Sequence, residues 1–166
     1  MAIPERAVPS DLAGYLAVMS RAIFQAGLSW KLIERKWDAY LRLFEGFDPV
    51  LVAAFGEADV ERIMEDGGVV RTRKKIVATI DNARTLLALE REFGMRAYLR
   101  SFESYEELAR DFRTRFKFVG ELSAYYFVFL VGERVPRFET WERTIHGDHP
   151  RMREMIARAR ETGYDG

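Results

Sequence analysis

Apolar residues recur at helical spacing along most of this chain, and no stretch alternates polar and apolar residues as a strand does. The pattern predicts a first helix that is capped by Ser10 or Asp11 and ends near Phe24. Further helices are predicted over residues 30–44, 50–55, 57–65, 71–93, 104–112, 121–131 and from 150 onward. The helix over 121–131 is apolar on every side, which is typical of a helix at the centre of its domain. We therefore predict an all-α helical bundle, with residues 1–166 forming one domain.

The composition limits the kinds of partner, metal site and cellular location that this protein can have. The 166 residues are 48% hydrophobic and 31% charged, as in ordinary globular proteins, and carry no net charge, so any contact with DNA has to come from a local patch. The absence of cysteine excludes disulfides and thiolate metal sites. The longest apolar run, residues 124–131, is too short to cross a bilayer, and the N-terminus shows no signal sequence, so we expect a cytoplasmic protein that does not contact membranes. The sequence leaves the oligomeric state open.

A glycine turn separates the first two predicted helices. Gly27 permits a backbone conformation that other residues resist, and Ser29 can cap the next helix with its hydroxyl. This arrangement brings Leu28 and Trp30 to the start of that helix, either as core residues at a helix corner or as groups exposed for binding.

A second glycine turn, Gly67-Gly68, joins the predicted helices over 57–65 and 71–93. Backbone N–H groups at such a hairpin and at the following helix N-terminus can hold a phosphate. Four cations follow the turn: Arg71, Arg73, Lys74 and Lys75. Because the helix dipole disfavours cations at this end, the cluster suggests a site for an anionic partner, although a solvated cationic helix start is the alternative.

Five short segments, taken in order, resemble the DNA-3-methyladenine glycosylase I family over roughly Pro4 to Val131. They are Gln25-Ala26-Gly27-Leu28-Ser29-Trp30, Phe47-Asp48-Pro49-Val50, Asp59-Val60-Glu61-Arg62-Ile63, Gly68-Val69-Val70-Arg71 with Lys75-Ile76, Ala78 and Asn82-Ala83, and Phe116-Lys117-Phe118-Val119-Gly120. The resemblance implies a helix–hairpin–helix glycosylase that flips an alkylated base out of double-stranded DNA and hydrolyses its N-glycosidic bond.

The resemblance also implies roles for single residues. Trp30 matches the tryptophan that stacks on the base, and Gly27-Leu28 matches the turn that enters the duplex as an apolar wedge. Gln25 and Tyr125 are expected to contribute to substrate binding. Gly67, Gly68, Arg71, Arg73, Lys74 and Lys75 are expected to bind DNA.

The sequence departs from the family in three ways. Ala22 stands where the family has its recognition glutamate, and there are no cysteines for the family's zinc site. We also expect the chain to lack the family's N-terminal segment with further aromatic pocket residues. Glu121 is a candidate replacement for the glutamate if it faces the pocket, or else a helix-start residue that complements the dipole. We expect no cofactor and no metal, and we interpret His146 and His149 as loop residues. Two functions remain open: a glycosylase of altered specificity, and a catalytically silent relative that binds damaged or distorted duplex.

Overall fold

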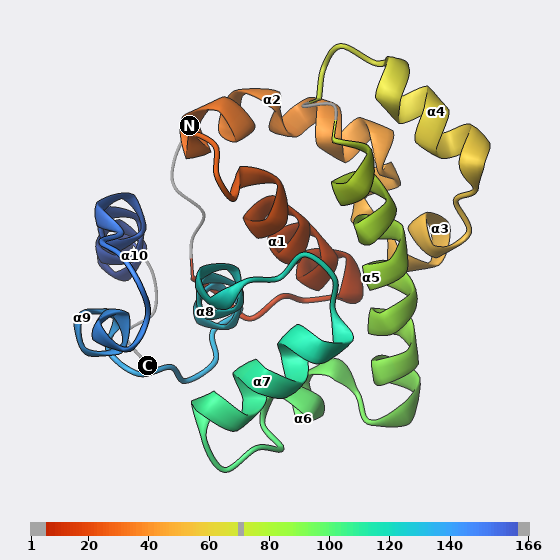
Figure 1. Cartoon of the computed structure of the whole chain (residues 1–166). Helices are drawn as coiled ribbons and strands as arrows, with labels where there is room; N and C mark the ends of the chain where they lie inside the picture. The colour runs from red at the N-terminus through yellow and green to blue at the C-terminus, as the bar shows by residue number, and fades with distance from the viewer. Residues whose placement is uncertain (1–5, 70–71, 163–166) are drawn as a thin grey trace.

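Helix α1 (Leu12–Gln25) runs through the middle of the molecule and packs against α5 (Arg73–Glu92) and α8 (Glu121–Leu130) (Figure 1). The structure is a computed structural model, and it describes residues 6–69 and 72–162. Within those ranges every regular element is helical and none is a strand, as the sequence predicts. No helix in the described part of the chain is both long and apolar enough to span a bilayer.

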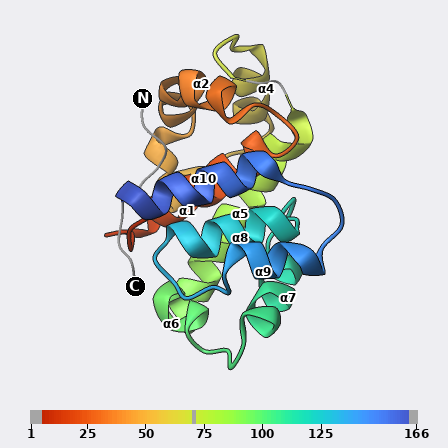
Figure 2. The ribbon, with the colours of Figure 1, turned by 90° about the vertical axis from the view of Figure 1, so that its left-hand side faces the viewer.

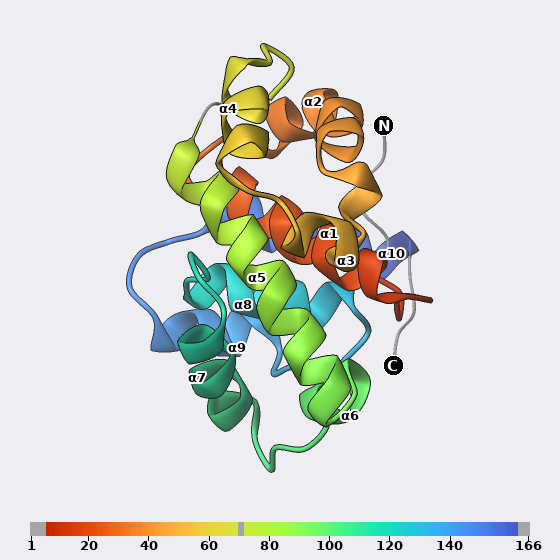
Figure 3. The same cartoon turned by 90° about the vertical axis from the view of Figure 1, so that its right-hand side faces the viewer.

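The helices α2 (Trp30–Leu43) and α4 (Glu57–Glu65) lie at one end of the molecule, whereas α3 (Pro49–Ala53) packs against α5 in the middle (Figure 3). Asp48 caps α3 by accepting a hydrogen bond from the Val50 N–H, and Pro49 occupies the first helical position. Asp11 caps α1 in the same manner, through the Gly14 N–H. The Asp11 cap agrees with the sequence prediction for the first helix, and both caps depend on residues only two or three positions away.

The opposite end contains α6 (Met95–Leu99) and α7 (Tyr105–Arg115). The Ser104 hydroxyl caps α7 by accepting a hydrogen bond from the Glu107 N–H. The helix extends three residues beyond the predicted end at Phe112.

The C-terminal segment forms α9 (Phe138–Trp141) and α10 (Pro150–Thr162), which lie side by side on one flank of the bundle (Figures 1 and 2). Helix α8 separates two apolar clusters, which explains why it is apolar on every side. Phe127 and Val128 face the main core with α1 and α5, whereas Tyr126 and Leu130 face a second core built with α9 and α10. Residues of the tail therefore help to complete the hydrophobic interior.

Candidate functional site

The turn between α1 and α2 has the conformation that its glycine predicts. Gly27 has a φ of +78° and is exposed, and the Leu28 N–H donates to the Gln25 carbonyl oxygen at 2.9 Å. Ser29 precedes α2, but the prediction that its hydroxyl caps the helix is wrong, since no side-chain hydrogen bond to α2 is found there. Ser29 is exposed, so water can satisfy the first N–H groups of α2 instead.

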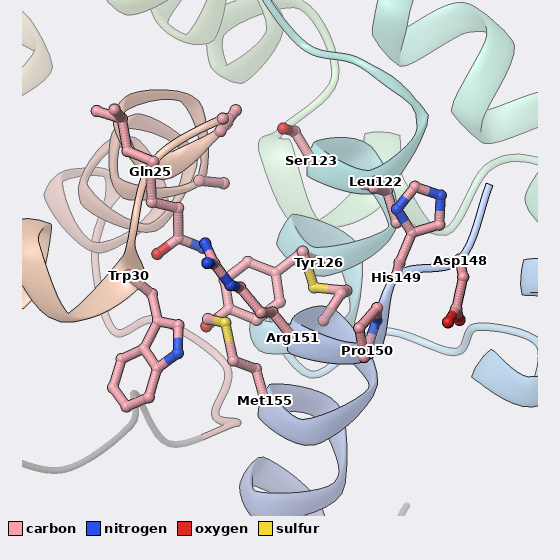
Figure 4. Close-up of a pocket in the computed structure, with 15 residues that line it drawn as sticks. Gln25, Trp30, Leu122, Ser123, Tyr126, Asp148, His149, Pro150, Arg151 and Met155 are labelled. Atoms are coloured by element: carbon pink, nitrogen blue, oxygen red, sulfur yellow. The ribbon is translucent and has the colours of Figure 1, made fainter. Parts of the chain in front are cut away.

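A cavity of about 420 Å³ opens beside Trp30, between α1, the glycine turn, α8 and the start of α10 (Figure 4). Its size is within the range of small-molecule pockets. The wall from α1 and the turn consists of Ala22, Gln25, Ala26, Gly27, Leu28 and Trp30. Leu122, Ser123 and Tyr126 come from α8, and Asp148, His149, Pro150, Arg151, Met152 and Met155 come from the tail.

Trp30 and Leu28, the predicted stacking and wedge residues, are both half-buried. Leu28 packs against the main core and Trp30 against the second core, while the Lys31 ammonium lies 5.7 Å from the centroid of the Trp30 ring. Each side chain thus packs against an apolar cluster on one side and lines the cavity on another.

Ala22, which the sequence resemblance places where the family has its recognition glutamate, lines the cavity. Beside it, Gln25 and Tyr126 are buried, and burial raises the pKa of Tyr126 to about 12, opposed by the charge of Arg21 and by the neighbouring Gln25 side chain. Among the lining residues that the structure describes, Asp148 supplies the one carboxylate, and it is ion-paired with Arg153 at 2.6 Å.

Two predicted site residues lie outside this cavity. Glu121 is exposed at the start of α8, pairs with Arg113 at 3.6 Å and does not line the cavity. Tyr125 lies away from the cavity, where its hydroxyl donates to the Pro136 carbonyl oxygen at 2.5 Å and its ring stacks on Trp141. Helical geometry accounts for this placement, because adjacent positions such as Tyr125 and Tyr126 diverge by about 100° around the axis.

The tail supplies pocket residues that have no role in the sequence prediction. Arg153 contacts both Asp148 and Glu142 at 2.6 Å and so holds the loop before α10. His149 lines the cavity with its Nε2 2.8 Å from the His146 carbonyl oxygen. Among the described residues, no group of three side chains could hold a metal ion. No local pattern identifies these residues, because their role depends on where α10 docks.

The predicted DNA-binding residues lie around the connection between α4 and α5, and the cations that the structure describes there differ in their surroundings. Arg73 pairs with Glu57 at 2.9 Å and with Glu61, which neutralises its charge locally. Lys75 donates from Nζ to the Ala26 carbonyl oxygen at 3.1 Å. Lys74 is exposed and forms no ion pair or hydrogen bond with the described residues. Arg73, Lys74 and Lys75 therefore do not form one uniform cluster.

The hairpin backbone is closely packed at one glycine. The Gly68 N–H donates to Asp66 Oδ1 at 2.7 Å, and a Cβ added at Gly68 would lie 2.8 Å from the Cβ of Ala39. Gly67, the other predicted contact in the turn, is exposed. Arg71 lies outside the described residues.

The loop before α8 is fixed by Asn82 of α5. Its amide donates to the Lys117 carbonyl oxygen at 3.1 Å and its Oδ1 accepts from the Lys117 N–H at 2.7 Å. Phe118 follows with a φ of +59° and is 51% exposed, which is rare for a large aromatic residue. This exposed ring lies near Ala26 and Glu121, at the edge of the same face as the glycine turn.

Comparisons with known proteins agree with this architecture. Residues 7–123 match the methyladenine glycosylase family model. A segment of 66 residues is 52% identical to DNA-3-methyladenine glycosylase 1 of Escherichia coli, covering 40% of this chain and 35% of that enzyme, so the match spans about a third of the relative.

Two solved structures share the fold. A crystal structure of 3-methyladenine DNA glycosylase I superposes with a TM-score of 0.66 and 30% identity, over 78% of this chain and 83% of the other. A variant of 3-methyladenine DNA glycosylase I in complex with 3-methyladenine gives a TM-score of 0.65 and 25% identity, over 75% and 79% of the two chains. Because the family model covers well over half of its residues, the chain belongs to the methyladenine glycosylase family.

Proposed function

We propose that this protein is a DNA glycosylase of altered specificity, which flips an alkylated base of the 3-methyladenine type out of duplex DNA and hydrolyses its glycosidic bond. The observation that carries the proposal is the cavity beside Trp30, which lies next to the exposed glycine turn in a chain of this family. One structural relative holds 3-methyladenine, which supports a base as the occupant.

The geometry supports separate roles for Leu28, Trp30 and Lys74 in binding DNA. Leu28, at the tip of the turn, can fill the space that a flipped base leaves in the duplex. Trp30 can stack on the flipped base from the cavity wall. Lys74 and the Gly67-Gly68 hairpin can contact phosphates, because the lysine is exposed and has no protein partner in the described structure.

Hydrolysis of a cationic alkylated base demands little of the protein, because the positive charge already weakens the glycosidic bond. Positioning by Trp30 and desolvation of the base in the cavity are then the main contributions of this chain. A buried hydrogen bond to the lesion typically contributes on the order of 1–3 kcal/mol, and Ala22 cannot form one. We therefore expect release of 3-methyladenine to be weak.

The second candidate function is binding of damaged or distorted duplex without excision. It is favoured by Ala22, which leaves the cavity without the family's glutamate, and by the pairing of Asp148 with Arg153. The two candidates share the cavity and the DNA-binding face, and they differ in whether a free base is released.

The deciding experiment measures free base released from methylated duplex DNA by the unmodified protein, by Ala22→Glu and by Trp30→Ala. A glycosylase releases base at a low rate, and Ala22→Glu raises that rate by about ten- to a hundredfold if one buried hydrogen bond is restored. Ala58→Glu is the matched control, because it adds the same side chain at an exposed position on α4.

Two other outcomes distinguish a silent DNA-binding relative from a protein that shares only the fold. Tight binding of alkylated or abasic duplex with no base released by either protein establishes the silent relative. If neither protein releases base and Trp30→Ala leaves DNA binding unchanged, the resemblance is one of fold alone and the proposal is wrong.

A further inference from the structure

Phe118, in the loop between α7 and α8, keeps half of its aromatic ring in water. The side chain is 51% exposed, and the backbone has a φ of +59°, a conformation that bulky residues rarely adopt. Phe47 has the same φ, but its ring is fully buried and stacks on other aromatic rings, so packing offsets the strain there. At Phe118 packing offsets less of it. Strained residues of this kind cluster at sites that contact a ligand.

The loop holds the Phe118 ring in a fixed place. Phe116 and Val119, two residues before it and one after it, are buried in the main core. The backbone of Lys117 forms two hydrogen bonds with the side chain of Asn82, at 2.7 and 3.1 Å. Because the backbone is tied down on both sides of the ring, little conformational freedom is lost when the ring meets a ligand.

The ring lies beside the turn that carries the proposed wedge residue. Phe118 and Ala26 line one hollow of about 320 Å³, which extends along the first turn of α8. Ala26 also lines the cavity beside Trp30, so it belongs to both walls. Trp30 lines only the cavity, and Phe118 lines only the hollow. When a base is flipped toward Trp30, Phe118 is thus left for the part of the duplex that the base has departed from.

We infer that Phe118 stacks on the orphaned base, which is the base of the opposite strand that loses its partner when the lesion is flipped. The inference rests on the proposed function, since it assumes that a base is flipped into the cavity. Leu28 can fill the vacancy, but a leucine side chain has no flat face, so an aromatic ring is the better stacking partner for the orphaned base. Such stacking tolerates any base, because every base has a π face.

Phe93 shows what an exposed phenylalanine without this setting looks like. It is 52% exposed, but it has a negative φ and follows the last residue of α5. The other end of α5 lies beside the glycine turn, through the hydrogen bond from Lys75 to Ala26. Phe93 is therefore about 27 Å from that end along the helix axis. It provides a matched control for the loss of an exposed ring.

The test is a double-mutant cycle between the ring and the orphaned base. Two duplexes carry an abasic site, which lies opposite adenine in the first and opposite a second abasic site in the second. Binding of both is measured for the unmodified protein and for Phe118→Asn, because asparagine adopts a positive φ readily and lacks the ring. We expect this substitution to weaken binding of the first duplex roughly tenfold and of the second by less than about twofold, since only the first has a base to stack on.

Two further variants separate stacking from a structural effect. Phe93→Asn should weaken binding of neither duplex, and Phe118→Tyr should keep the affinity of the unmodified protein because it keeps the ring. Phe118→Asn should melt at a temperature no lower than the unmodified protein, since the ring is half exposed and asparagine suits the backbone conformation.

The inference is overturned if Phe118→Asn leaves binding of the first duplex unchanged, or if it weakens binding of both duplexes equally. The proposed function survives either result as long as the unmodified protein binds the first duplex more tightly than an intact duplex. If the unmodified protein binds the abasic and intact duplexes equally, the proposed function and the inference are both wrong.

Discussion

Lys75, at the start of α5, donates a hydrogen bond from its ammonium group to the carbonyl oxygen of Ala26 at 3.1 Å. This contact joins the glycine hairpin, where phosphate binding is proposed, to the turn that carries Leu28 into the proposed DNA interface. Burial lowers the pKa of Lys75, as expected for an ammonium that is partly removed from water. The Lys75 side chain therefore fixes the position of the glycine turn relative to the start of α5. The sequence alone assigns this lysine to DNA binding only.

The first prediction concerns Lys75→Met, which keeps the length of the side chain and removes its hydrogen bond. We expect faster amide hydrogen exchange at Gly27 and Leu28, because the turn loses its tie to α5. Lys74→Met is the control, since no hydrogen bond or ion pair joins Lys74 to the turn among the described residues. Equal exchange rates in both variants would show that the hydrogen bond does not restrain the turn.

The second prediction concerns how Lys74 and Arg73 each contribute to the salt dependence of DNA affinity. Lys74→Ala should reduce the slope of log K against log salt concentration for duplex binding by about one unit, which is the loss of one phosphate contact. Arg73→Ala should reduce it less, because Glu57 and Glu61 already neutralise that arginine. A larger effect of Arg73→Ala would mean that the arginine leaves these carboxylates when DNA binds.

The third prediction concerns Glu121→Gln. Its ion pair with Arg113 is exposed, and such pairs typically contribute about 0–1 kcal/mol, so stability should change little. Because Glu121 lies outside the cavity beside Trp30, release of base from methylated duplex should also be unchanged. Abolished release by a folded Glu121→Gln protein would restore Glu121 as a catalytic residue.

The fourth prediction is a loss of stability at alkaline pH. Tyr126 ionises near pH 10 in the unfolded chain, whereas burial raises its pKa to about 12 in the folded protein. The folded state thus retains a proton that the unfolded state loses, so the free energy of unfolding falls between about pH 10 and 12. Tyr126→Phe should remove roughly 1–3 kcal/mol of that fall, as measured by urea denaturation at pH 9 and pH 11.5. The same pH dependence in both proteins would exclude a role for this hydroxyl.

The fifth prediction concerns metal. We expect no bound zinc in the purified protein and no loss of helicity or change of melting temperature after chelation, because the chain has no cysteine. Elemental analysis and circular dichroism check this directly. Stoichiometric zinc that is lost in His149→Ala would show that the loop before α10 is a metal site.

The sequence by itself determined most of the helices and the family, although it did not predict the short helices α6 and α9. The predicted bounds of α4 agree residue for residue, Asp11 and Asp48 cap the helices they precede, and Gly27 adopts a positive φ. Each of these features depends on residues within a few positions or on the period of one helix, so a short stretch of sequence is enough to predict it. The five motifs identify the family for the same reason, since each is a short continuous segment.

Only the tertiary structure decided what the site contains. The cavity brings together residues near Ala22, Tyr126 and Arg151, which are separated by more than a hundred positions at the extremes. The neutralisation of Arg73 by α4, the exposure of Glu121 and the wall supplied by α10 all depend on how helices dock. Docking is set by side-chain packing over the whole core, and no local pattern encodes it. The sequence therefore determined the helices and the turn, and the packing of the tail against α8 decided the chemistry of the pocket beside them.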